Sequence, residues 1–129
     1  MQIRCGFIGG VALLIGLVCV AQERVHVIYF RWNSPILLPS MEQRVLTAAQ
    51  TAKLARRVEV TGYTDTSLSD AESVDISDRM AKAVVAELIR HGVPREVIVS
   101  RGLGEVNLVK DTGDGVIEPR NRRVEIVIR

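Results

Sequence analysis

The sequence predicts an α/β (α+β) two-layer sandwich, in which helices cover one face of a mixed four-stranded sheet. Short β-branched runs alternate with two amphipathic stretches, and turn residues separate these segments. No internal repeat or low-complexity tract interrupts them. The expected order is βαβαββ, with strands over residues 25–30, 57–63, 97–99 and 124–128, one helix over residues 40–52, and a second from Asp70 or Val74 to His91.

The first helix is expected to begin at a capping box formed by Ser40 and Gln43, three residues apart. The second helix carries an apolar stripe at four-residue steps, from Ile76 through Met80 to its last turn. Gly92 is expected to supply the left-handed residue that ends this helix.

The second strand alternates apolar and polar residues, which predicts one buried and one solvated face. Before the last strand lies a long stretch, residues 102–123, which is rich in turn signals. Loops of this length in small domains usually have a function.

Residues 1–21 have the pattern of a targeting segment. One arginine precedes residues 5–21, which carry no charge and end in small residues. This pattern is typical of a secretory signal peptide, with cleavage expected after Ala21. A retained N-terminal anchor is the alternative, because an apolar stretch of this length can span a bilayer. The predicted domain comprises residues 22–129.

Both cysteines of the chain, Cys5 and Cys19, lie inside the targeting segment. A lipoprotein signal would need a small residue before the cysteine, and Val18 before Cys19 fits this poorly. We therefore expect a domain without disulfides or cysteine-based metal sites.

Composition excludes several classes of protein. The chain of 129 residues has 17 basic and 15 acidic residues, a net charge of +2. A dedicated nucleic-acid binder needs a clustered excess of basic residues, so nucleic acid is not an expected partner. Aromatic residues make up only 4% of the chain, which disfavours a stacking platform for bases.

Asp65 follows the second strand directly, where a carboxylate can receive a cation in a crevice; the alternative is a turn or cap aspartate. The only dense basic run is residues 120–123, whose guanidinium groups can bind a ligand carboxylate in bidentate fashion. His26 and His91 are too far apart in the sequence to suggest a metal site. No catalytic constellation supports an enzyme such as a cell-wall hydrolase, and we expect no cofactor.

Six motifs then occur in a characteristic order. They are Tyr29-Phe30-Arg31-Trp32-Asn33, Gly62-Tyr63-Thr64-Asp65, Ile76-Ser77-Asp78-Arg79-Met80-Ala81, Gly92-Val93-Pro94, Gly102-Leu103-Gly104-Glu105 and Asn121-Arg122-Arg123-Val124-Glu125-Ile126. With these motifs, residues 27–129 resemble the OmpA C-terminal-like domain, the peptidoglycan-associating module of Gram-negative outer-membrane proteins, lipoproteins and flagellar stators.

The resemblance implies a non-enzymatic domain that binds the diaminopimelate side chain of the peptidoglycan stem peptide. The free end of that side chain carries an ammonium and a carboxylate, so its site needs an anion and a cation. In the family the anion is the motif aspartate, which matches Asp65 beside Thr64. The cation is an arginine fifteen residues later, where this chain has Met80. Arg79 is adjacent but points about 100° away on a helix.

Two hypotheses follow. In the first, a non-catalytic cell-envelope protein binds peptidoglycan, with Arg79 or Arg122 as the cation near Asp65 and with Thr64 and Asn121 in the site. In the second, a degenerate OmpA-like domain has lost that binding and serves as a periplasmic protein-interaction module. The expected location is the periplasm, in association with the outer membrane or the cell wall, where outer-membrane or periplasmic proteins are possible partners.

Overall fold

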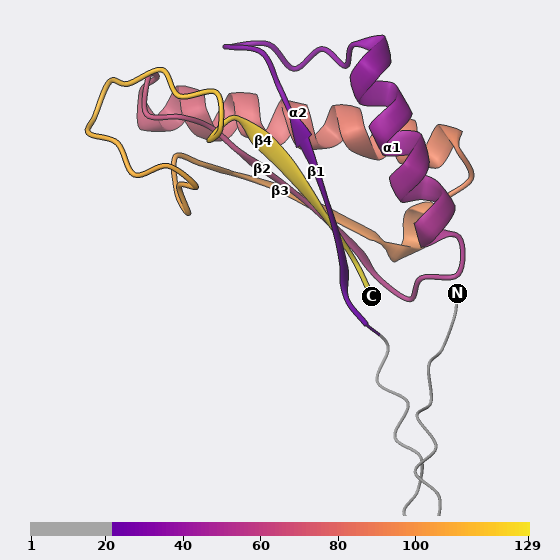
Figure 1. Cartoon of the computed structure of the whole chain (residues 1–129). Coiled ribbons are helices and arrows are strands. Elements are labelled where there is room, and N and C mark those ends of the chain that lie inside the picture. The colour runs from indigo at the N-terminus through magenta and orange to yellow at the C-terminus, as the bar shows by residue number, and fades with distance from the viewer. Residues whose placement is uncertain (1–21) are drawn as a thin grey trace, which may run out of the picture.

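A computed structural model describes residues 22–129, so the predicted targeting segment lies outside the described residues. One sheet carries two helices on the same face (Figure 1), and the predicted fold class is confirmed. The elements are β1 (Arg24–Tyr29), α1 (Pro39–Ala52), β2 (Val58–Tyr63), α2 (Asp70–Arg90), a 3₁₀ turn (Arg95–Val97), β3 (Ile98–Gly104) and β4 (Arg123–Ile128).

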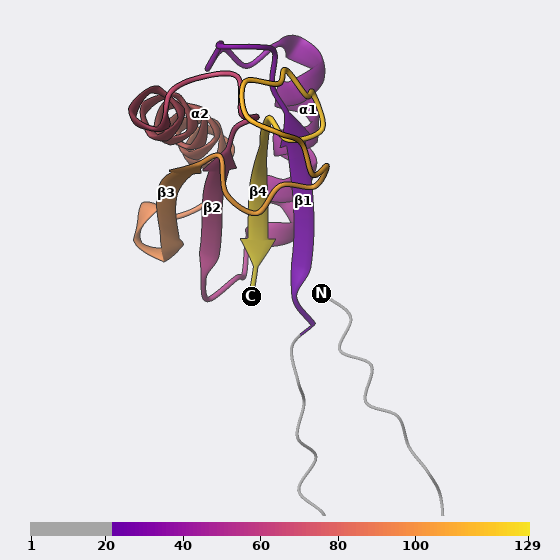
Figure 2. The same ribbon diagram turned by 90° about the vertical axis from the view of Figure 1, so that its left-hand side faces the viewer.

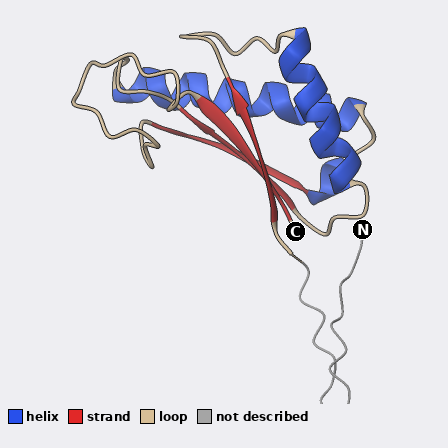
Figure 3. Cartoon of the chain, in the orientation of Figure 1, coloured by secondary structure: helices blue, strands red, loops and turns tan. Residues whose placement is uncertain are grey.

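The strand order in the sheet is β1-β4-β2-β3. β2 and β3 are parallel, whereas β4 runs antiparallel to both β1 and β2. Arg24 of β1 lies opposite Ile128 of β4, so the described chain begins and ends at the same end of the sheet (Figure 2). The carboxyl ends of β2 and β3 lie at the opposite end, beside the long loop that follows β3 (Figure 3).

A single core joins the sheet to both helices. It consists of aliphatic side chains from the inner face of the sheet and from the apolar stripes of α1 and α2, with Val45, Val60, Val84 and Ile126 among those fully buried. The sheet, the two helices and this core all lie within residues 22–129. A chain of about 100 residues can bury enough apolar surface to fold on its own.

The first helix does not begin at the predicted capping box. Leu38 is its N-cap and Pro39 occupies the first helical position, so Ser40 lies inside the first turn. Proline is suited to this position because its φ angle is already helical and it has no N–H group to leave unpaired. The helix therefore begins at Pro39 and not at the predicted capping box.

The second helix begins at Asp70, the earlier of the two predicted starts. The Ser69 hydroxyl accepts a hydrogen bond from the Glu72 amide, and the Glu72 carboxylate accepts one from the Ser69 amide. At the other end Gly92 has the predicted positive φ of 94°, and the Val93 amide donates to the Leu88 carbonyl at 3.0 Å. Neither helix of residues 22–129 is both long and apolar enough to cross a membrane.

The third strand is longer than the sequence predicts, since it extends from Ile98 to Gly104 rather than over residues 97–99. Its second half contains Arg101 and two glycines, which do not form an apolar strand pattern. These residues pair with the second half of β2, from Thr61 to Tyr63, and the two glycines pack under α2. Backbone pairing with β2 therefore extends β3 over residues whose side chains do not follow a strand pattern. The ends of the other elements differ from prediction by at most one residue.

The prediction of a solvated face on β2 is wrong at two of its three residues, because Thr61 and Tyr63 are each 7% exposed and only Glu59 is half-buried. The Arg123 guanidinium lies 4.2 Å from the centre of the Tyr63 ring, and its Nη2 donates to the Asn107 carbonyl at 2.8 Å. The loop of residues 105–122 thereby folds over the outer face of the sheet (Figure 2). That loop brings the second half of the candidate site into place.

Candidate functional site

Asp65 lies at the carboxyl end of β2, two residues after the strand ends. The Thr64 amide donates to the Gly104 carbonyl at 2.9 Å, which keeps this segment beside the end of β3. Asp65 is only 1% exposed. The predicted crevice residue is therefore a buried carboxylate, which needs partners to stay charged.

Four donors satisfy the Asp65 carboxylate. Arg122 Nη1 donates to Oδ2 at 2.9 Å, and the Glu118 amide donates to the same oxygen at 3.0 Å. The Ser67 amide donates to Oδ1 at 3.2 Å, and the Ser67 hydroxyl donates to Oδ1 as well. Each carboxylate oxygen thus has two hydrogen bonds.

These contacts determine the ionisation of Asp65. Burial by itself would raise the pKa of this carboxyl. The hydrogen bonds from the Ser67 hydroxyl, the Arg122 guanidinium and the Glu118 and Ser67 amides outweigh burial, so the pKa of Asp65 lies below its ordinary value. Asp65 is therefore an anion at neutral pH.

Arg122 joins Asp65 to the end of β1. Its side chain is 11% exposed, and its Nε donates to the Phe30 carbonyl at 3.3 Å. The Arg122 carbonyl accepts the Phe30 amide at 3.0 Å. These contacts use Nε and Nη1 of the guanidinium, whereas Nη2 donates to no group of the described residues. Arg122 thus keeps a donor edge while it neutralises Asp65.

Asn121 is fully buried, but its side-chain hydrogen bonds go to Lys110 and not to Asp65. Its side-chain amide donates to the Lys110 carbonyl at 2.8 Å, and its side-chain oxygen accepts the Lys110 amide at 2.8 Å. This pair of bonds closes the base of the loop of residues 105–122. Asn121 therefore shapes the site through the loop and not through direct contact.

Thr66 anchors the middle of the same loop. Its hydroxyl donates to the Gly113 carbonyl at 2.7 Å and accepts the Val116 amide at 3.1 Å. The Thr66 carbonyl accepts the Gly115 amide at 2.8 Å. These bonds place Glu118 where its amide reaches Asp65.

The Thr64 hydroxyl, which was a predicted site group, is buried and has no hydrogen-bond partner among the described residues. Arg79 lies elsewhere: its side chain is 59% exposed and its Nη1 is 3.9 Å from an Asp75 oxygen, one turn earlier on α2. Met80 is 2% exposed and belongs to the core. The structure thus brings Arg122 to Asp65 and does not bring Arg79 there.

The sequence matches the OmpA family over residues 29–122. This chain belongs to the OmpA family. It is similar to an outer membrane protein of Gluconacetobacter diazotrophicus, with 37% identity over 113 residues that cover 81% of this chain and 30% of that protein. It is also similar to the peptidoglycan-binding protein ArfA of Mycobacterium bovis, with 38% identity over 72 residues that cover 56% of this chain and 22% of ArfA. The chain spans less than a third of either relative.

Solved structures show the same OmpA-like fold. The peptidoglycan-associated lipoprotein of Burkholderia pseudomallei superposes with a TM-score of 0.73 at 23% identity, covering 81% of this chain and 90% of that one. The OmpA-like domain of FopA1 from Francisella tularensis superposes with a TM-score of 0.71 at 19% identity, covering 83% and 75%. The predicted resemblance is confirmed.

Two contacts in this OmpA-family site were not predicted. Ser67 lies two residues after Asp65, and an aspartate that accepts the amide two residues on is a common turn, so this contact had a sequence signal. The Glu118 amide had none, because it comes from a loop 53 residues away. Trp32, which is half-exposed, donates from Nε1 to the Ser67 hydroxyl at 2.9 Å and lies at the edge of the site.

Asp65 accepts hydrogen bonds with both oxygens, and the Ser67 hydroxyl that donates to Oδ1 itself accepts the Trp32 Nε1 hydrogen bond. His26 lies on β1, where burial and the nearby Arg24 charge lower its pKa, and His91 pairs with Glu87 at the end of α2. Residues 22–129 contain no cluster of three or more metal-ligating side chains. The OmpA family is in general non-catalytic.

Proposed function

We propose that this chain is a non-catalytic cell-envelope protein that binds peptidoglycan at the end of the domain where Asp65 and Arg122 meet. The observation that carries the proposal is the buried ion pair between these two side chains, with 2.9 Å between Arg122 Nη1 and Asp65 Oδ2. The names of two similar proteins support it, since ArfA is a peptidoglycan-binding protein and a structural relative is a peptidoglycan-associated lipoprotein.

The proposed ligand is the diaminopimelate end of a stem peptide, which carries an ammonium and a carboxylate. Arg122 Nη2, which donates to no described residue, can bind the ligand carboxylate while Nη1 stays on Asp65. The ligand ammonium can replace the Ser67 hydroxyl on Asp65 Oδ1, because a hydroxyl can rotate away without a change in the backbone. In this proposal, Arg122 supplies the positive charge that the family arginine provides and that Met80 cannot. Arg79 does not contribute to the binding site.

The proposed location follows from the proposed ligand. Peptidoglycan lies in the cell envelope, and several relatives are outer membrane proteins. We therefore place this chain in the periplasm, in association with the cell wall or the outer membrane, after export by the predicted signal in residues 1–21.

The test is co-sedimentation of residues 22–129 with purified sacculi. Arg122→Lys keeps the positive charge beside Asp65 but removes the second donor of the fork, so we expect binding to weaken at least about fivefold. Arg120→Lys is the matched control, because Arg120 is exposed and pairs with Glu118 rather than with Asp65. Each variant is assayed below its unfolding temperature, measured separately, since loss of an internal contact also affects folding.

Equal weakening by both variants would refute the role of Arg122. No binding by the wild-type domain would favour the second function, a module that binds a periplasmic protein. One observation favours that alternative: Asp65 already has four internal donors, so a ligand ammonium must displace one of them.

A further inference from the structure

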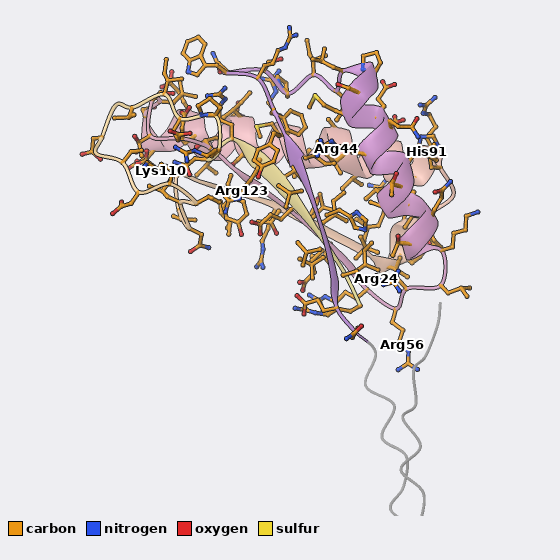
Figure 4. The ribbon with its side chains drawn as sticks, viewed as in Figure 1. Arg24, Arg44, Arg56, His91, Lys110 and Arg123 are labelled. Carbon is orange, nitrogen blue, oxygen red and sulfur yellow. The ribbon has the colours of Figure 1, made fainter. Side chains whose placement is uncertain are left out.

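The end of the domain opposite the Asp65 site exposes an apolar residue beside several cations. Leu54 follows α1 and is 81% exposed, the most exposed large hydrophobic side chain among the described residues. Lys53 and Arg56 flank it in sequence and are also exposed. Figure 4 shows Arg24 and Arg56 at this end, where the described chain begins and ends, and Lys110 at the other end. We call this set, Arg24, Lys53, Leu54 and Arg56, the basal patch.

A hollow of about 590 Å³ opens within the basal patch. Its lining includes Gln22, Arg24, Lys53, Leu54, Ala55 and Ile128. The lining therefore combines two cations with aliphatic side chains, and α1 adds the polar side chains of Thr47, Gln50 and Thr51. A surface of this kind suits a partner that offers both negative charge and hydrocarbon.

The cations of the basal patch are not neutralised internally. The acidic side chains nearby are already paired, since Arg129 contacts Glu59 at 3.0 Å and Glu23 at 3.3 Å, and Arg57 also contacts Glu59. Arg24, Lys53 and Arg56 have no salt bridge within residues 22–129. With a net charge of only +2 for the whole chain, this end holds a local excess of positive charge.

The backbone holds the patch in a fixed shape. The Arg56 amide donates to the Arg129 carbonyl at 2.8 Å, and the Arg129 amide donates to the Arg57 carbonyl at 2.9 Å. The segment that carries Lys53, Leu54 and Arg56 is thus tied to the end of β4. Binding there does not require the segment to become ordered, which lowers the entropic cost.

We propose that the basal patch binds the surface of an anionic phospholipid bilayer. Arg24, Lys53 and Arg56 contact the headgroup phosphates, and Leu54 enters the boundary of the acyl chains. In the sequence, the uncharged residues 5–21 directly precede Gln22, which lines the hollow. The proposal does not depend on peptidoglycan binding, because the Asp65 site lies at the opposite end.

The experiment measures co-sedimentation of residues 22–129 with vesicles. This portion excludes the apolar leader, which would bind vesicles by itself. We expect binding to phosphatidylcholine vesicles that contain phosphatidylglycerol, little binding to phosphatidylcholine alone, and loss of binding at high salt. The double variant Lys53→Glu/Arg56→Glu should lower the partition coefficient at least about tenfold, and Leu54→Ser should lower it by a smaller factor.

The matched control is Arg101→Glu/Lys110→Glu, which changes the net charge by the same amount away from the basal patch. It should retain most of the binding. Circular dichroism verifies that every variant is folded. Equal binding to charged and neutral vesicles, or equal loss in the control, would overturn the proposal, as would wild-type binding that persists at high salt.

Discussion

At the scale of single residues, the ion pair between Asp65 and Arg122 links three distant segments of the chain. Asp65 follows β2, Arg122 precedes β4, and the Phe30 carbonyl after β1 accepts a hydrogen bond from Arg122 Nε. Removing one partner of a buried ion pair leaves the other charge buried without a counter-charge. The resulting loss of stability is larger than the net stabilisation that the intact pair provides. The pair is therefore a structural requirement as well as a candidate binding group.

Asp65→Asn should lower the free energy of unfolding at neutral pH by about 3 kcal/mol, because it leaves the Arg122 guanidinium without an anion. The pKa of Asp65 is lower in the folded state than in the unfolded chain, where it is about 4. Its stabilisation is thus fully present above the unfolded pKa and is lost as the pH falls through the folded pKa. Urea unfolding at a series of pH values should show the difference between the two proteins shrinking in acid. A difference that stays constant would contradict the assignment.

At the scale of elements, two glycines let α2 lie directly on the sheet. Gly62 of β2 and Gly102 of β3 are opposite each other in the parallel register. A Cβ at Gly62 would overlap the Ser77 carbonyl, and one at Gly102 would overlap the Asp78 amide. The backbone of α2 therefore occupies the space that side chains at these two positions would need.

Gly62→Ala should destabilise the domain by about 3 kcal/mol, because the sheet and the helix would have to separate at a backbone contact. Gly113→Ala is the control, since a Cβ there meets nothing within 4 Å and the φ angle there is not in the left-handed region. Thermal unfolding of both variants measures the contrast. Similar melting temperatures for the two would refute the close approach of α2.

The elements also show where sequence patterning succeeds. The stripe of α2 and its Gly92 cap were predictable because they depend on neighbours one turn away. The second half of β3 was not predictable, because its glycines are needed for the close contact with α2, whereas glycine in a sequence usually indicates a turn. The same reason limits the site: Asp65 and Ser67 are close in sequence, whereas the Glu118 amide arrives through tertiary packing of the loop.

At the scale of the whole molecule, one core joins both helices to the sheet. The site loop is bonded to the sheet through Arg123 and to the segment after β2 through Thr66. We therefore expect residues 22–129 to unfold in a single transition. The chain has one tryptophan, Trp32, and its contact with Ser67 makes its fluorescence a reporter of the site. Denaturant midpoints from Trp32 fluorescence and from helical circular dichroism should coincide. A lower midpoint for fluorescence would mean that the site opens independently of the core.

The direction of the strands has a mechanical consequence. The described chain enters β1 at one end of the sheet, and Asp65 and Arg122 lie at the other. Tension between these two ends acts along the strands, so it loads the hydrogen bonds between β1 and β4 in shear. Six residue pairs, from Arg24 with Ile128 to Tyr29 with Arg123, then share the force together instead of opening one after another.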